Sequence, residues 1–298
     1  MWMGNIIRTI RASRHLWRRQ RPYADSLPYE IGDEIFKFTT ELLSEERVGP
    51  MVNVRWGYSE TESKYTPNGY PGCSPIAMAQ IMSYFKYPSS IAITYPGASI
   101  SSQYLDWNSM LEHEVEHRYK DCTATEEAHE AISQLVRQLG KLGSCVYGQN
   151  GTSNYITQAA SAMKSLGYNV SVIKSDIVEE MLSQIKNGQL LYMRGTDPTY
   201  SSGHAWVADG FIEYKMRITR WTRRLSGSTN WAVDEVTESN IQYLHYNWGR
   251  EGHCNGYFYA GIYSPINAYE YDNYVDDSYN EKFERDYNYD VAYFSVSR

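Results

Sequence analysis

The sequence has few cysteines, and they form no closely spaced pair. The four are Cys73, Cys122, Cys145 and Cys254, and no two show the Cys-x-x-Cys spacing of zinc ribbons or thioredoxin-type redox pairs. We therefore expect no metal ion and no other cofactor. A chain of 298 residues can bury a large core without covalent cross-links. We expect four free thiols, with a Cys122–Cys145 disulfide as the alternative.

The sequence also lacks long apolar runs and an excess of positive charge. No run approaches the roughly 18 apolar residues that a membrane span requires, and the basic stretch at residues 1–21 has no apolar centre like that of a signal peptide. The chain carries 28 Lys and Arg against 35 Asp and Glu, for a net charge of −7. We therefore expect no membrane span, no signal peptide in this chain and no nucleic-acid partner. No pattern indicates the oligomeric state.

Hydrophobic residues make up 42% of the chain, which is enough to fill a core. Residues 1–48 differ from the rest, because a basic arm is followed by apolar residues with helical spacing up to the break at Gly49-Pro50. We predict an arm and a helix there, with a short propeptide remnant as one interpretation. A main domain is predicted over residues 49–298.

Helical patterns precede strand patterns within the main domain. Helical spacing covers most of residues 104–143 and returns at residues 154–168. From residue 169 onward, short β-branched and aromatic runs alternate with Gly, Asn and Asp, which is typical of strands and turns. Helices followed by antiparallel strands predict an α+β fold with a crevice where the two halves meet.

Cys73 directly precedes a predicted helix. In GYPGCSPIAMAQIMSYFKYP, residues 69–88, apolar side chains recur with helical spacing, and Pro75 is tolerated in the first turn. The helix would begin at or beside Cys73, where free amide groups and the helix dipole stabilise a thiolate. A lone cysteine is more often a small buried hydrophobe. The position nevertheless makes Cys73 a candidate nucleophile.

Two motifs further along the chain supply partners for a thiolate. A nucleophilic cysteine needs a base and a group that orients it, and one large class of cysteine enzymes carries these about 130 to 150 residues downstream. His204 lies at that distance in SSGHAWVADG, where it would start a strand, and Asn247 ends the next strand pattern in YLHYNWG. We predict that Asn247 holds the imidazole of His204 and that Trp248 shields this hydrogen bond. His245 and His253 are competing candidates for the base.

The three motifs together resemble those of the streptopain family of papain-like cysteine peptidases. GCSPIAMAQIMSYFKYP is similar to the nucleophile motif, GHAWVADG to the base motif and HYNWGREGHCNGYF to the Asn-Trp-Gly motif. The resemblance covers most of residues 49–298. It implies a two-lobed fold, in which a helical lobe precedes an antiparallel β lobe and the active-site cleft lies between them. It also implies that Cys73 is the nucleophile, that His204 is the general base and then acid, and that Asn247 and Trp248 orient it.

The same resemblance implies a polypeptide substrate and a zymogen that is secreted or held at the cell surface. Gly203 and Arg250 would line the substrate cleft. Arg250 stands where the family usually has Trp, and Tyr58, in RWGYSE, stands where it usually has the Gln that donates to the oxyanion. Loss of one such donor costs about 100- to 1,000-fold in turnover, and the Tyr58 hydroxyl is the candidate replacement. Because the family prodomain is longer than residues 1–48, we expect a fragment or a chain that lost the usual zymogen control.

Three functional hypotheses follow. The leading one is a cysteine endopeptidase that hydrolyses peptide bonds through a thiolate and an acyl-enzyme. The alternative, motivated by Tyr58, is a catalytically impaired homologue that binds peptides or a partner protein. The third is a papain-like transferase, a class that usually takes Asp as the third group. Asp209 beside His204, with Asn247 remote, would favour the transferase.

Overall fold

The computed structural model describes the following residues: 29–31, 34–113, 124–149, 151–224, 230–272 and 285–298. The chain divides into two units. Unit 1 comprises Met1–Glu46 and Glu213–Gln242, and unit 2 comprises Arg47–Ile212 and Tyr243–Arg298. Cys122 lies outside the described residues.

The described residues form a mixture of helices and antiparallel strands. The helices are α2 (Glu60–Ser63), α3 (Cys73–Phe85), α4 (Trp107–Leu111), α5 (Glu126–Leu142), α6 (Ile156–Ser165) and α7 (Val178–Lys186). The strands are β1 (Tyr29–Ile31), β2 (Glu34–Val48), β3 (Ser90–Ala92), β4 (Ser102–Tyr104), β5 (Val146–Gly148), β6 (Gly151–Ser153), β7 (Asn169–Val170), β8 (Lys174–Ser175), β9 (Leu190–Thr196), β10 (Gly203–Arg224), β11 (Ala232–Asn247), β12 (Gly256–Tyr259), β13 (Glu270–Tyr271) and β14 (Tyr289–Ser297). The predicted α+β class is confirmed.

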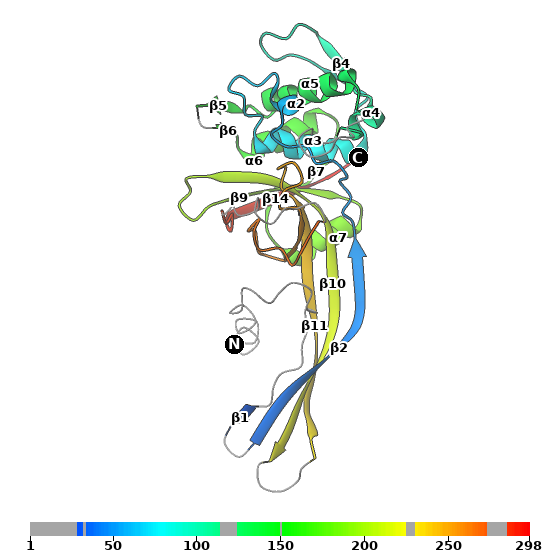
Figure 1. Cartoon of the computed structure of the whole chain (residues 1–298), viewed down its shortest axis with the longest axis vertical. Coiled ribbons are helices and arrows are strands. Elements are labelled where there is room, and N and C mark those ends of the chain that lie inside the picture. Colours follow the sequence, from blue (N-terminus) through cyan, green and yellow to red (C-terminus); the bar gives the residue numbers. More distant parts are fainter. Residues whose placement is uncertain (1–28, 32–33, 114–123, 150, 225–229, 273–284) are drawn as a thin grey trace. The chain divides into compact units, whose positions relative to one another are not determined.

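The sheet of unit 2 separates two hydrophobic cores. Its strands follow the order β13-β12-β11-β10-β9-β14-β7, so the C-terminal strand β14 is an interior strand between β9 and β7. Successive side chains of a strand point to opposite faces. On β10, Val207 belongs to the core shared with α3, α5 and α6, while Trp206 belongs to the core shared with α7. Figure 1 shows α3, α5 and α6 on one side of β9 and β14.

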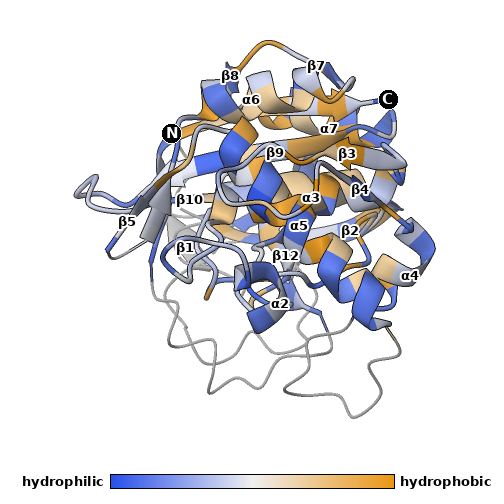
Figure 2. Cartoon of the chain, turned by 90° about the horizontal axis from the view of Figure 1, so that it is seen from above, coloured by the Kyte–Doolittle hydropathy of each residue, from blue (hydrophilic) through white to orange (hydrophobic). Residues whose placement is uncertain are grey.

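Helix α3 is the centre of the first core. It packs against both α5 and α6, and its residues from Ser74 to Ser83 are all buried. The amphipathic pattern read from the sequence therefore underestimates its burial, because polar Gln80 is as deeply buried as its apolar neighbours. Figure 2 shows the apolar character of α3 within this layer. A helix enclosed in this way gives Cys73, its first residue, a rigid mount.

Unit 1 is built from long strands and corrects one prediction. Residues 34–48, for which the spacing predicted a helix, form β2, which pairs with β1 and β10. Across these strands the Trp221 indole donates to Thr39 Oγ1 at 2.8 Å, and Arg217 forms an ion pair with Glu41 at 2.9 Å. The run IFKFTT is rich in β-branched and aromatic residues, and pairing with a segment distant in sequence decided its conformation.

Candidate active site

Cys73 is the first residue of α3, as the sequence predicts. The N-cap is Gly72, with a φ of 90°, and a side chain there would meet the Thr152 side chain at 2.8 Å. Glycine is therefore required both by conformation and by space. Cys73 is half-buried, and it lies at the end of the helix where unpaired amide groups favour negative charge.

The charge state of Cys73 results from opposing influences. Burial raises the pKa of the Cys73 thiol, while a hydrogen bond from the backbone of Ala205 and the positive charge of Arg250 act to lower it. The net result is a Cys73 pKa above its ordinary value. The resting site therefore favours the neutral thiol, and attack on a carbonyl requires a base.

His204 is the second residue of β10, where it lies opposite Gly195 of β9. Its side chain is buried, and Nε2 lies 2.8 Å from the backbone oxygen of Trp248. Because a carbonyl oxygen only accepts hydrogen bonds, Nε2 carries the proton and Nδ1 keeps a free lone pair. The imidazole is thus held in a tautomer that presents a base. Exposed Gly203 precedes it, at the start of the strand.

Aromatic rings enclose this imidazole. Tyr287 stacks on it with a centroid distance of 5.1 Å, and Trp248 and Trp206 lie at 6.0 and 6.3 Å. Burial first, and then the positive charge of Arg250, lower the pKa of His204 well below its ordinary value. The imidazole is therefore neutral at pH 7. A neutral imidazole is the form that can take a proton from a thiol.

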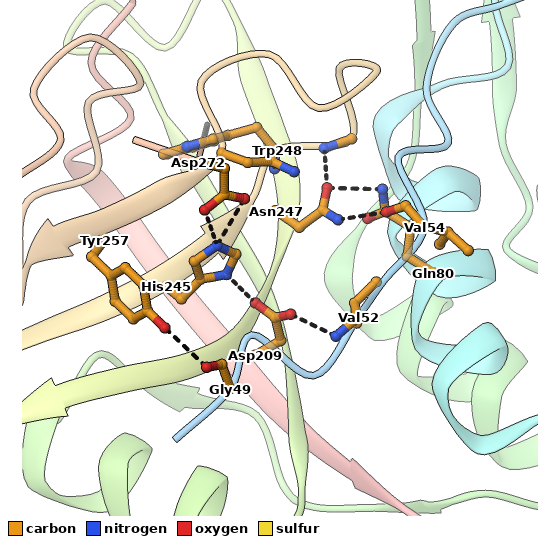
Figure 3. Close-up of polar contacts among 12 residues, drawn as sticks. Gly49, Val52, Val54, Gln80, Asp209, His245, Asn247, Trp248, Tyr257 and Asp272 are labelled. Atoms are coloured by element: carbon orange, nitrogen blue, oxygen red, sulfur yellow. Dashed lines mark hydrogen bonds and ion pairs between the residues drawn. The ribbon is translucent and has the colours of Figure 1, made fainter. Parts of the chain in front are cut away.

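Asn247 is the last residue of β11, and its amide connects three chain segments. Its Nδ2 donates to Val54 O at 3.0 Å, and its Oδ1 accepts from Gln80 Nε2 at 2.9 Å and from Gly249 N at 3.1 Å (Figure 3). The sequence predicts that this amide holds His204, whereas His204 Nε2 donates to the carbonyl of the next residue, Trp248. Asn247 fixes the turn that aims that carbonyl.

Gln80 is a site residue that sequence reasoning missed. Its Nε2 donates both to Asn247 and to the backbone oxygen of Trp56, at 3.0 Å. It therefore ties α3, which carries Cys73, to the segment that carries Tyr58. A polar residue within an otherwise apolar helical run was the available signal, because buried amides are normally hydrogen-bonded.

Tyr58 lies directly beside the nucleophile. The residue is 38% exposed, and its hydroxyl lies close enough to the side chain of Cys73 for the two groups to interact. Burial of the hydroxyl, and then the proximity of Cys73, raise the pKa of Tyr58 well above its ordinary value, so the phenol keeps its proton. The preceding loop is fixed because Gly57 N donates to Glu62 Oε1 at 3.1 Å. The phenol is therefore a positioned donor.

A second group of buried charges lies around His245 (Figure 3). His245 Nδ1 is 2.5 Å from Asp209 Oδ1, and its Nε2 is 3.3 Å from both oxygens of Asp272. Burial alone would lower the pKa of His245, but the charges of Asp209 and Asp272 outweigh it and raise the pKa to about 10. Asp209 is thus bonded to His245, and the arrangement that would favour a transferase is not the one observed.

The His245 group also anchors the start of the segment that leads to Tyr58. Asp209 accepts a hydrogen bond from Val52 N at 2.8 Å through its side chain and from Met51 N at 3.0 Å through its backbone. Tyr257 donates to Gly49 O at 3.1 Å. This role was not visible in the sequence, where His245 was a competing candidate for the base.

Two further cysteines lie in the described part of the chain. Cys145 and Cys254 are free thiols, like Cys73. Burial raises the pKa of Cys145 to about 12 and that of Cys254 to about 11. Both are therefore protonated thiols near neutral pH.

The site combines a thiol at a helix start with a neutral, oriented imidazole at a strand start, and the backbone of Ala205, the residue after that imidazole, lies against the thiol. Cysteine-dependent acyl-transfer enzymes use a thiol together with an imidazole. Comparison with known families makes this specific. The model of the Peptidase C10 family matches residues 56–258. The chain belongs to this family, the streptopain family of clan CA cysteine peptidases. A search of curated proteins gave no match.

Family membership carries a general expectation about location. The family is typically extracellular. Among the helices in the described part of the chain, none is both long and apolar enough to cross a membrane.

Proposed function

We propose that this protein is a cysteine endopeptidase in which Cys73 is the nucleophile and His204 the base. The observation that carries the proposal is the hydrogen bond from His204 Nε2 to the Trp248 carbonyl, because it leaves Nδ1 as the basic nitrogen. The position of Cys73 beside the backbone of Ala205, the residue after His204, supports the same assignment. The helical and sheet sides of unit 2 would be the two lobes of a papain-like fold.

The reaction proceeds in two displacements. His204 Nδ1 takes the thiol proton as Cys73 Sγ bonds to the peptide carbonyl carbon. The tetrahedral intermediate then collapses, and the same proton passes to the leaving amine. Water, deprotonated by His204, attacks the thioester, and the carboxylic acid product leaves as the Cys73 thiol is restored. Trp248 O stabilises the imidazolium in each intermediate, because it accepts from Nε2–H.

We assign the oxyanion site to two donors. One is the backbone N–H of Cys73 at the start of α3, and the other is the phenol of Tyr58. The protonated state of Tyr58 and its contact with Cys73 support this role. Preorganised donors of this kind typically contribute about 100- to 1,000-fold each to turnover.

Labelling with an irreversible epoxide inhibitor of papain-like peptidases tests the proposal. We expect one adduct by intact mass on the wild-type chain, none on Cys73→Ala, and an unchanged adduct on Cys145→Ala. We expect this selectivity because the proposed base, His204, acts on Cys73, whereas burial keeps the Cys145 and Cys254 thiols protonated. Peptide hydrolysis that persists in Cys73→Ala would contradict the assignment.

A second function has specific support. The neutral thiol and neutral imidazole, together with the hydroxyl of Tyr58 against the sulfur, favour a weakly active homologue that binds peptides. In that case Tyr58→Gln, which restores the donor usual in the family, would raise turnover at least tenfold while peptide affinity stays constant. An endopeptidase that uses the Tyr58 phenol would gain nothing from this change.

We also propose that the protein acts outside the cell, since its family is typically extracellular. Immunoblotting of the culture medium and of washed, intact cells of the source organism tests this. Recovery of the protein only from lysed cells would contradict it.

A further inference from the structure

Arg250 places a guanidinium next to the reacting groups. Its backbone oxygen accepts a hydrogen bond from His253 N at 2.9 Å, and its Nη2 donates to the Tyr287 hydroxyl at 2.7 Å. Tyr287 in turn stacks on His204 at 5.1 Å. Two residues that are close in sequence therefore act on the same imidazole. Trp248 accepts its hydrogen bond, and Arg250 places a cation near it through Tyr287.

The position of Arg250 is also evident in its electrostatic effect. After burial, its charge is the main influence that lowers the pKa of His204. It also acts to lower the pKa of Cys73 and that of Tyr58. The guanidinium therefore lies near the groups to which the proposed function assigns the reaction, and the residue is only partly buried.

The chemistry of the proposed reaction assigns this cation to one side of the substrate. His204 must deliver its proton to the leaving amine, so the groups packed around His204 face the part of the substrate that leaves. Tyr287 and Arg250 are such groups. A guanidinium binds a carboxylate through two parallel hydrogen bonds, and such charge-assisted bonds are the stronger kind.

We propose that Arg250 binds a carboxylate on the leaving-group side of the scissile bond. The substrates favoured would carry either an acidic side chain at the first position after that bond or a free C-terminal carboxylate there. Tyr287 positions the guanidinium by accepting from Nη2. This inference rests on the proposed function for the orientation of the substrate.

Hydrolysis of matched peptides tests the proposal with the full chain. One pair differs only in Glu or Gln at the first position after the scissile bond, and a second pair has a single leaving residue as free acid or as amide. We expect kcat/KM to favour the carboxylate of at least one pair by roughly 10- to 100-fold. The pair that shows the preference identifies the source of the carboxylate.

Three variants assign the preference to Arg250. In Arg250→Gln the ratio of kcat/KM values within each pair should fall to about one. In Arg250→Lys, which keeps the charge but loses the two parallel donors of the guanidinium, the ratio should be intermediate. Lys164→Gln removes an exposed charge at the end of α6 and should leave the ratio unchanged. Active wild-type enzyme with ratios near one in both pairs would overturn this inference while leaving the endopeptidase proposal intact.

Binding provides a readout that needs no turnover. Fluorescence anisotropy on Cys73→Ala with the same labelled peptides should show tighter binding of the carboxylate member, and this difference should vanish in Cys73→Ala with Arg250→Gln. Carboxylate-dependent binding by a wild-type chain that hydrolyses neither pair would uphold the inference and contradict the endopeptidase. Equal affinity, or undetectable binding of all four peptides, would overturn the inference.

Discussion

Two buried histidines of the same sheet differ in almost every property except burial. His204, on β10, has aromatic rings around it and one hydrogen bond to a carbonyl, and its pKa lies well below the ordinary value. His245, on β11, lies between the carboxylates of Asp209 and Asp272, and its pKa is raised to about 10.

The difference shows that burial alone does not define the role of an imidazole. Without a carboxylate partner, burial favours the neutral base, which suits proton transfer. Two carboxylates outweigh the effect of burial and favour a permanent cation, which suits an anchor. His204 is accordingly assigned to the reaction and His245 to the support of the segment that carries Tyr58.

The largest effect should come from removing the neutral imidazole. His204→Gln should lower kcat/KM by about 100- to 10,000-fold, the range that general acid–base catalysis supplies. The urea midpoint should change little. The matched control, Asp272→Asn, alters the other histidine and should keep most of the turnover. If both variants are fully folded and lose activity to a comparable extent, the distinction between the roles of His204 and His245 is wrong.

Removing a charge from the group formed by Asp209, His245 and Asp272 should lower stability rather than activity. Asp209→Asn leaves His245 without its closest counter-charge and should lower the free energy of unfolding by about 3 to 5 kcal/mol. Urea denaturation followed by tryptophan fluorescence measures this. The folded fraction should still take up the epoxide at Cys73. A variant as stable as the wild type would show that the Asp209–His245 pair is not an anchor.

The stabilisation from His245 should depend on pH. Its folded pKa of about 10 lies above the unfolded value of about 6.5. The contribution should therefore be complete below about pH 6.5 and decline as the pH rises through about 10. The difference in unfolding free energy between wild type and Asp209→Asn should shrink from pH 6 to pH 10. A constant difference would mean that His245 is not the cation.

The smallest effect is expected at Asn247. Asn247→Ala removes the donor to Val54 O and one of the two acceptors of Gln80 Nε2, which keeps its bond to Trp56 O. A buried group left unpaired costs about 1 to 3 kcal/mol. Because Trp248 still holds His204, kcat/KM should fall far less than in His204→Gln. An equal loss would place Asn247 directly in the reaction. Gln80→Leu, which removes the same link from the other side, provides the comparison.

The sequence predicted the elements that carry local signals. The start of α3 at Cys73 followed from helical spacing after a glycine, and the strand start at His204 followed from a glycine before an apolar run. These signals lie within a few residues of the feature that they define. The α+β class followed from the order of such segments.

What the sequence did not predict depends on contacts between distant segments. The conformation of β2 was decided by its pairing with β10, and the group that holds His204 is a backbone carbonyl, which no residue type identifies. Tyr287 reaches His204 from the last part of the chain. The pairing of Asp209 with His245 places two residues from different strands together, and spacing alone gives no such match.

The amide of Asn247 has a consequence for how the protein reaches its native state. It joins α3, β11 and the segment near Val54, which are far apart along the chain, so these bonds close large loops. Contacts of this kind form late, because the entropy of loop closure must be overcome first. A partly folded chain therefore exposes Cys73 without its base, and reactivity toward the epoxide during refolding reports the completion of folding.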